Sequence, residues 1–293
     1  MIDIITVVFQ PELYYLKVQA RSIEQYIDSD KIGKIFVVVN DESSVCNLVD
    51  TDWWGINRNK VVVIDRKQFG VNECVPGWES QQYYKLACAN IAESNWSMVL
   101  DAKTWFIQTL DFSKIFDPVG RVTFGIYPTL DAFKTAEESV EKYFNIESKE
   151  VIGPAGVPFF FNTSEMNSLY KYLIDNGTNM FDFFTTNVLY PMLLTEFMFY
   201  SAWIKFKYGT LEVLYSYDSP YMVTNIADFQ MYEFDDLFYN NMQKRNNLTV
   251  SIHRKVYSAL TDQQLNTWVN FLHSKNLIDN PTETFQLLNM NKC

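Results

Sequence analysis

The chain has 293 residues, of which 48% are hydrophobic and 16% aromatic, and its formal net charge is -11 at pH 7. This length fits one large domain, or one domain with an appended segment, and the apolar content suffices for a full core. An acidic surface repels nucleic acid and anionic membranes, so we expect no nucleic-acid partner, and an anionic ligand would need local positive charge from lysines or a metal.

Cysteine content and the N-terminus predict a reduced, cytoplasmic protein. The four cysteines are Cys46, Cys74, Cys88 and Cys293. Their spacing matches neither a metal site nor a disulfide framework. Asp3 and Pro11 interrupt the N-terminal apolar run, and no basic leader precedes it, so we expect no signal peptide.

Three apolar runs rich in β-branched residues predict buried strands in the first quarter of the chain. They cover Ile2 to Phe9, Ile35 to Val39 and Val61 to Ile64. Between the first two, Leu13 to Ile27 places apolar residues at helical spacing. Continuous apolar strands indicate a sheet covered on both faces, and the strand-helix-strand order indicates parallel pairing.

Polar residues follow these strands at the point where each one ends. Asn40-Asp41 follow the second strand and Asp65-Arg66 the third. In open α/β sheets, ligands bind at the carboxyl ends of the strands, so this repetition predicts a nucleotide crevice.

The segment from Gln81 to Phe106 carries the most informative pattern. We expect a helix over Glu79 to Ala92, followed by a buried strand over Met98 to Asp101 that ends in the charged triplet Asp101-Ala102-Lys103. A carboxylate is costly to bury without a partner. Gln81 and Lys85 share one helix face and can reach the strand end. The segment therefore predicts a ligand site, with an ordinary strand-to-loop ion pair as the alternative.

The rest of the chain predicts further helices and a less regular last third. In chain order we expect a strand over Val122 to Tyr127, an exposed polar helix over Asp131 to Tyr143, a loop over Val151 to Phe161 leading into a strand or a helix, and helices over Ser164 to Asp175, Thr195 to Phe206 and Asp262 to Lys275. Residues 215–236 are aromatic and acidic, without a clear period. The most membrane-like stretch, residues 183–204, contains Asn187, Pro191 and Glu196, which favours a buried helix with an irregular start.

Several well-known catalytic motifs are absent. The first predicted strand ends in Phe9-Gln10-Pro11-Glu12, without a GxGxxG, and the chain has no P-loop, G-x-S-x-G elbow or HExxH. Two histidines in total exclude a histidine-rich metal site. The remaining enzyme classes use carboxylates, lysines and at most one histidine.

Two candidate residues each have a structural and a functional interpretation. Glu196 is a lone acid in an apolar helix, where desolvation would raise its pKa toward that of a general base, but an acid near a helix start also favours the helix dipole. His253 follows a short β-branched run and, alone, is best interpreted as structural. His273 is expected on a helix surface.

Asp101-x-Lys103 is close to the D-x-D pattern of metal-dependent nucleotide-sugar transferases. In that pattern two carboxylates hold a divalent cation against the diphosphate. Lys103 replaces the second carboxylate here, and its ammonium could supply the positive charge directly. Both interpretations stay open: Mn²⁺ or Mg²⁺ held by Asp101 and His253, or no metal.

The ordered set of motifs resembles a glycosyltransferase of the GT-A type, and more narrowly the DUF6492 family of bacterial and phage proteins. The matching segments are IITVVF at 4–9, IFVVVND at 35–41, GWESQQYYKLACA at 77–89, VLDAKTWF at 99–106, PFFFN at 158–162, TEFMFYSAW at 195–203 and SIHR at 251–254. The resemblance implies a single α/β domain over residues 1–255, with a mainly parallel mixed sheet flanked by helices, and a helical extension over 256–293 packed on it.

The resemblance also implies an activity and its residues. The chain would be a hexosyltransferase that moves a sugar from a nucleotide-diphosphate sugar, such as a UDP-sugar, to an acceptor hydroxyl. Glu196 would be the general base, and Lys103 would stabilise the leaving diphosphate. The residues implied for donor binding are Thr6, Val7, Phe9, Asp41, Gln81, Lys85, Asp101, Ala102, Lys103, His253 and Arg254. The alternatives are a nucleotidyltransferase and a catalytically inactive nucleotide-sugar-binding protein.

Overall fold

The computed structural model describes residues 1–70, 77–147, 149–152, 157–185, 194–227, 230 and 232–290. Cys74, Cys293, Asn187 and Pro191 lie outside these ranges. Within them, Cys46 and Cys88 are free thiols, and no helix is both long and apolar enough to cross a bilayer.

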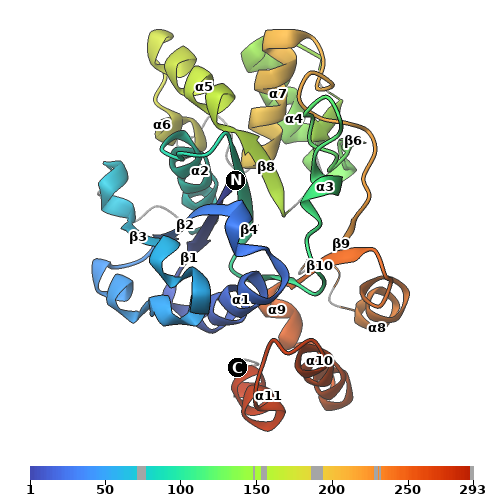
Figure 1. The fold of residues 1–293 in the computed structure, drawn as a ribbon. Helices are drawn as coiled ribbons and strands as arrows, with labels where there is room; N and C mark the ends of the chain where they lie inside the picture. Colours follow the sequence, from blue (N-terminus) through green and yellow to red (C-terminus); the bar gives the residue numbers. More distant parts are fainter. Residues whose placement is uncertain are drawn as a thin grey trace.

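The central sheet forms around the buried N-terminal run. β1 (Ile2–Val8) is buried along its whole length and pairs in parallel with β2 (Ile32–Val39) and β4 (Trp96–Asp101). β3 (Val61–Asp65) pairs in parallel with β2, and β8 (Phe159–Asn162) is antiparallel to β4. The order β3-β2-β1-β4-β8 confirms the expected mixed, mainly parallel sheet (Figure 1).

Two helices connect the parallel strands. α1 (Leu13–Tyr26) joins β1 to β2, and α2 (Gly77–Asn90) precedes β4. The chain moves outward from β1 to β3 and then returns to β4 on the other side of β1. Right-handed crossovers therefore place α1 and α2 on opposite faces of the sheet, as Figure 1 shows. The reversal of strand order lies between β1 and β4, which is where open α/β sheets form ligand crevices.

A second sheet joins the end of β4 to the last third of the chain. β5 (Thr104–Phe106) pairs antiparallel with β10 (Asn247–Ile252), which pairs in parallel with β9 (Met222–Ile226). β6 (Ile126–Pro128) and β7 (Glu150–Ile152) form an antiparallel pair. The other α-helices are α3 (Phe112–Ile115), α4 (Lys134–Phe144), α5 (Thr163–Asp175), α6 (Met180–Thr185), α7 (Glu196–Tyr208), α8 (Phe234–Leu237), α9 (Arg254–Tyr257), α10 (Asp262–Ser274) and α11 (Pro281–Met290).

The predicted strand over Val122 to Tyr127 is wrong in its first part. Val122 forms only isolated bridges, and Gly125 has a φ of +94°, which breaks the extended backbone before β6 begins at Ile126. The sequence also missed β9 and α11. The helices after residue 255 pack on β5 and β10, where the rings of Trp105 and Trp268 stack with centroids 5.7 Å apart. The division at residue 255 stays a prediction.

Candidate functional site

The carboxyl ends of the four parallel strands meet at one edge of the sheet. The register places Val7 beside Asp101, Val8 beside Val39, and Val39 beside Asp65. Residues that follow these strands therefore lie next to one another, as the polar strand ends predicted. Asp41 accepts hydrogen bonds from the backbone amides of Gln10 at 2.9 Å and Glu42 at 2.8 Å, which links the segments after β1 and β2.

The charged triplet forms the tight turn between β4 and β5. Gln19, on the buried face of α1, bridges the two ends of this turn. Its Nε2 donates to the carbonyl oxygens of Asp101 at 2.6 Å and Thr104 at 3.1 Å. Ala102 is fully buried, which leaves Asp101 and Lys103 as the turn's polar side chains. The sequence analysis missed Gln19. The available signal was an amide in the apolar stripe of an amphipathic helix, three residues after Leu16.

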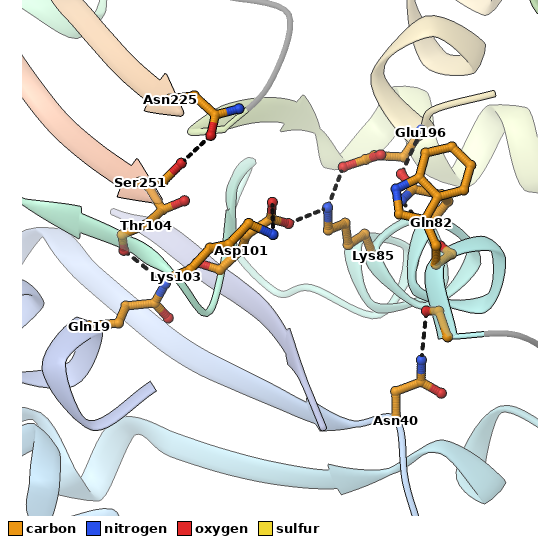
Figure 2. A network of polar contacts seen from close by, with 12 residues as sticks. Gln19, Asn40, Gln82, Lys85, Asp101, Lys103, Thr104, Glu196, Asn225 and Ser251 are labelled. Atoms are coloured by element: carbon orange, nitrogen blue, oxygen red, sulfur yellow. Dashed lines mark hydrogen bonds and ion pairs between the residues drawn. The ribbon is translucent and has the colours of Figure 1, made fainter. Parts of the chain in front are cut away.

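A buried lysine joins the triplet to α7. Lys85, on α2, places its Nζ 2.7 Å from Asp101 Oδ1 and 2.8 Å from Glu196 Oε1. Figure 2 shows this ammonium between the two carboxylates. Lys103 Nζ lies 3.3 Å from the other oxygen of Asp101. The Lys85 and Glu196 side chains are 4% and 2% exposed, so this pair is buried, unlike a surface ion pair. Whether it serves a ligand site or is a structural strand-to-loop ion pair stays a prediction.

The charges of these groups depend on one another. Burial disfavours the charged form of Lys85, but the carboxylates of Asp101 and Glu196 outweigh it and raise its pKa. Burial acts against the Asp101 carboxylate as well, but Lys103 and Lys85 hold its pKa well below the usual range. Burial raises the pKa of Glu196, and Lys85 offsets only part of this. The site thus holds an ionised Asp101 beside a Glu196 shifted toward the range of a general base.

Glu196 begins α7, and two polar neighbours fix this helix start. The Thr195 side chain accepts a hydrogen bond from the Met198 amide, and Gln82 Oε1 accepts one from the Glu196 amide at 3.4 Å. The sequence singled out Gln81 for its spacing from Lys85, but its neighbour Gln82 is the glutamine of α2 that hydrogen-bonds to α7, beside the Lys85 contact (Figure 2). Gln81 is half-buried, and its proposed contact with the donor stays a prediction.

The expected base and ribose residues lie at or near the end of β1. Thr6 and Val7 are buried inside the sheet, and the Thr6 hydroxyl has no hydrogen-bond partner among the described residues. Phe9 is half-buried, and the guanidinium of Arg254 lies 5.3 Å from the centroid of its ring. The structure therefore brings Phe9 and Arg254 together across 245 positions of sequence.

His253 lies beside the charged turn by strand register. Ser251 of β10 pairs with Thr104 of β5, so the residues after β10 reach the turn before β5. His253 is half-buried, and as the N-cap of the short helix α9 its side chain accepts a hydrogen bond from the Lys255 amide. His273, in contrast, is exposed on α10, as predicted.

The residues present do not fit a divalent cation. No group of three His, Cys, Asp or Glu side chains gathers at a metal-binding distance in the described part of the chain. Both oxygens of Asp101 already face ammonium groups, those of Lys85 and Lys103. A cation bound to Asp101 would have to displace the ammonium groups of both lysines, and Asp101 would be the one carboxylate that it gained as a ligand. The metal assignment to Asp101 and His253 stays a prediction, and the donor set favours the metal-free alternative.

Glu12 is a further acid that the sequence analysis did not single out as a candidate. It ends the short helical turn Gln10–Glu12 after β1 and is 5% exposed. Burial raises the pKa of its carboxyl, and the charges that act on it next belong to Lys103, Asp101 and Arg254. Glu12 therefore faces the same site. A buried acid directly after a strand end was the signal that could have identified it.

Solved glycosyltransferase structures resemble this chain over nearly its full length. The galactosyltransferase LgtC, crystallised with donor and acceptor sugar analogues, shares 15% sequence identity at a TM-score of 0.52, and the match covers 95% of this chain and 97% of that chain. An active-site mutant of LgtC gives 13% identity at the same TM-score of 0.52, with 97% and 100% covered. At these identities the likeness establishes the fold, which is the GT-A fold of these transferases.

Two comparisons with sequences add the family of the chain. A comparison with curated proteins found no match to the chain. The model of a family of unknown function, DUF6492, matches residues 10–279, and the chain therefore belongs to this family.

Proposed function

We propose that this protein is a glycosyltransferase that binds a nucleotide-diphosphate sugar at the carboxyl ends of β1, β2 and β4 and transfers the sugar to an acceptor hydroxyl. The observation that carries the proposal is the buried Lys85, which joins Asp101 at a strand end to Glu196 on α7. A buried ion pair is weak evidence for stability alone, because desolvation offsets most of its attraction. Its position at the strand-order reversal supports a functional role.

The diphosphate is the part of the donor that the lysines would bind. Lys103 is 14% exposed at the turn, and the guanidinium of Arg254 lies 5.3 Å from the centroid of the Phe9 ring. Both residues present permanent positive charge where an otherwise acidic chain needs it. As the sugar leaves, negative charge builds on the diphosphate, and fixed ammonium groups stabilise that charge more than they stabilise the intact donor.

Glu196 would accept the proton of the attacking hydroxyl. Its raised pKa makes it a stronger base than an exposed glutamate, and Lys85 offsets part of that rise. In this mechanism the acceptor hydroxyl donates its proton to Glu196 as its oxygen attacks the anomeric carbon, and the bond from that carbon to the diphosphate breaks. UDP-sugars are the donors we propose to test first, with GDP-sugars second.

Donor turnover followed by phosphorus NMR tests the proposal. We expect release of the nucleoside diphosphate from one of these donors, to water or to an added acceptor. Glu196→Gln should lower turnover by about 100-fold or more, as expected for a general base, while donor binding persists. Glu138→Gln, which removes an acid from the exposed face of α4, should leave turnover unchanged.

Three results would contradict parts of the proposal. Full turnover in Glu196→Gln excludes this residue as the base. Donor binding without turnover by the wild type, with every acceptor tried, would instead support the inactive nucleotide-sugar-binding protein. Transfer of the nucleotidyl group, seen as release of pyrophosphate from a nucleoside triphosphate, would support a nucleotidyltransferase.

A further inference from the structure

Glu12 carries a buried carboxylate for which the described residues provide neither a hydrogen bond nor an ion pair. Its backbone amide donates to the carbonyl of Phe9 at 2.8 Å, but its side chain has no such contact. The residue as a whole is 5% exposed, so its carboxylate keeps only a narrow contact with water. Leaving a buried charged group without a partner costs folding free energy, so its presence calls for an explanation.

The position of Glu12 at a helix start does not provide that explanation. Glu12 is the N-cap residue of α1, where an acid favours the helix dipole. Its side chain nevertheless accepts none of the free amides of the first turn. Asp50 and Asp65, which are N-caps elsewhere in this chain, do accept such bonds.

The surroundings of Glu12 are the candidate site itself. Beyond burial, the groups that act on its charge are Lys103, Asp101, Arg254 and Lys85. Each of them already has a role in the donor site described above. Phe9, in the same turn as Glu12, lies under the guanidinium of Arg254. Glu12 therefore lies in the turn that follows β1, hydrogen-bonded through its backbone to Phe9, whose ring faces Arg254.

The chemistry of a nucleotide-sugar donor limits what a carboxylate can bind. Phosphate oxygens accept hydrogen bonds and repel a carboxylate, so they belong to the lysines. Hydroxyls donate, and the two oxygens of one carboxylate can receive two adjacent hydroxyls. A pyrimidine base offers at most isolated N–H donors.

We propose that Glu12 binds a vicinal diol of the donor, either the 2′- and 3′-hydroxyls of the ribose or two hydroxyls of the transferred sugar. This inference rests on the proposed function. Because the carboxylate has no partner among the described residues, each hydroxyl of a bound donor can give it a charge-assisted hydrogen bond. A donor that lacks one of the two hydroxyls would leave the carboxylate partly unpaired, so the site would bind that donor more weakly.

Calorimetric titration tests the inference. Wild type, Glu12→Gln and Glu138→Gln are each titrated with UDP, 2′-deoxy-UDP and UDP-glucose. If only GDP binds, GDP and 2′-deoxy-GDP replace UDP and 2′-deoxy-UDP. If the diol is the ribose, wild type prefers UDP over 2′-deoxy-UDP by about tenfold or more, and Glu12→Gln loses that preference. If the diol is on the sugar, Glu12→Gln weakens UDP-glucose by about tenfold and leaves UDP unchanged. Glu138→Gln matches wild type in every titration.

Stability provides a readout independent of binding. Because Glu12→Gln removes an unpaired buried charge, its Tm without ligand should equal or exceed that of wild type. Glu12→Ala serves as a second variant with the same expectation. Unchanged affinity for all probes in both variants overturns the inference while the proposed function stands. A lowered Tm together with an equal loss of affinity for every probe also overturns the inference, because it indicates a structural role for Glu12. If wild type binds none of the nucleotides, the proposed function and this inference both fail.

Discussion

Lys85 is the residue on which the charge balance of the site depends. Its ammonium is the shared partner of two carboxylates, and the Lys85 and Glu196 side chains have almost no access to water. Water cannot replace the missing partner if one member is removed. Without Lys85, Glu196 carries the cost of burial alone, and Asp101 keeps only Lys103 as a partner.

We predict that Lys85→Met lowers the free energy of unfolding by about 3–5 kcal/mol, because it leaves Asp101 and Glu196 without their shared cation. Urea unfolding followed by circular dichroism measures this loss. Lys171→Met is the matched control, since Lys171 pairs with Asp175 on the surface of α5 and its loss should cost less than about 1 kcal/mol. Equal, small effects of both substitutions would show that the buried pair contributes little.

The charged residues of the site could be predicted from the sequence. The neutral glutamines that hydrogen-bond to the same segments could not. Asp101 and Lys103 contrast with the apolar strand before them, which marks them in the sequence. Lys85 follows from helical spacing. Gln82 and Gln19 act through amide contacts to groups far away in sequence, at 114 and 82 positions for the Glu196 amide and the Asp101 carbonyl. No local pattern specifies such contacts.

At the scale of elements, the turn between β4 and β5 depends on α1. The Gln19 side chain is fully buried and donates to the carbonyl at each end of the turn. These carbonyls lie where the chain leaves one sheet and enters the other. Gln19 therefore positions the turn that carries Asp101 and Lys103.

We predict that Gln19→Leu, which keeps the approximate shape but removes the amide, lowers the free energy of unfolding by about 1–3 kcal/mol because two buried carbonyls lose their donor. It should also weaken nucleotide binding, since the turn loses its fixed geometry. Denaturant unfolding and calorimetry with UDP measure the two effects. Gln263→Leu on the exposed face of α10 is the control. A destabilised Gln19→Leu protein that binds UDP as tightly as wild type would show that Gln19 does not position the site.

Elements were predicted best where burial is continuous in sequence. The four parallel strands and the helices α1, α2, α5, α7 and α10 follow from apolar runs and helical periods. β9 was missed because it lies in an aromatic, acidic segment, is only partly buried, and forms by pairing with β10 some 25 residues away. Such pairing is decided by tertiary contacts that a local pattern does not contain.

At the scale of the whole molecule, an acidic protein binds an anionic donor only where it concentrates positive charge. The chain carries 35 acidic and 24 basic residues, yet two lysines meet at the end of β4 and an arginine lies nearby. Both Asp101 oxygens face lysines, and we propose that the ammonium of Lys103 supplies the positive charge that a divalent cation would otherwise bring.

Calorimetric titration of UDP in EDTA and in Mn²⁺ tests this claim most directly. We predict that wild type binds UDP with the same affinity in both buffers, within about twofold. Lys103→Asp, which supplies a second acid, should lose UDP binding in EDTA and regain it with Mn²⁺. Wild-type binding that requires Mn²⁺ would contradict the metal-free role of Lys103 and make Asp101 and His253 metal ligands.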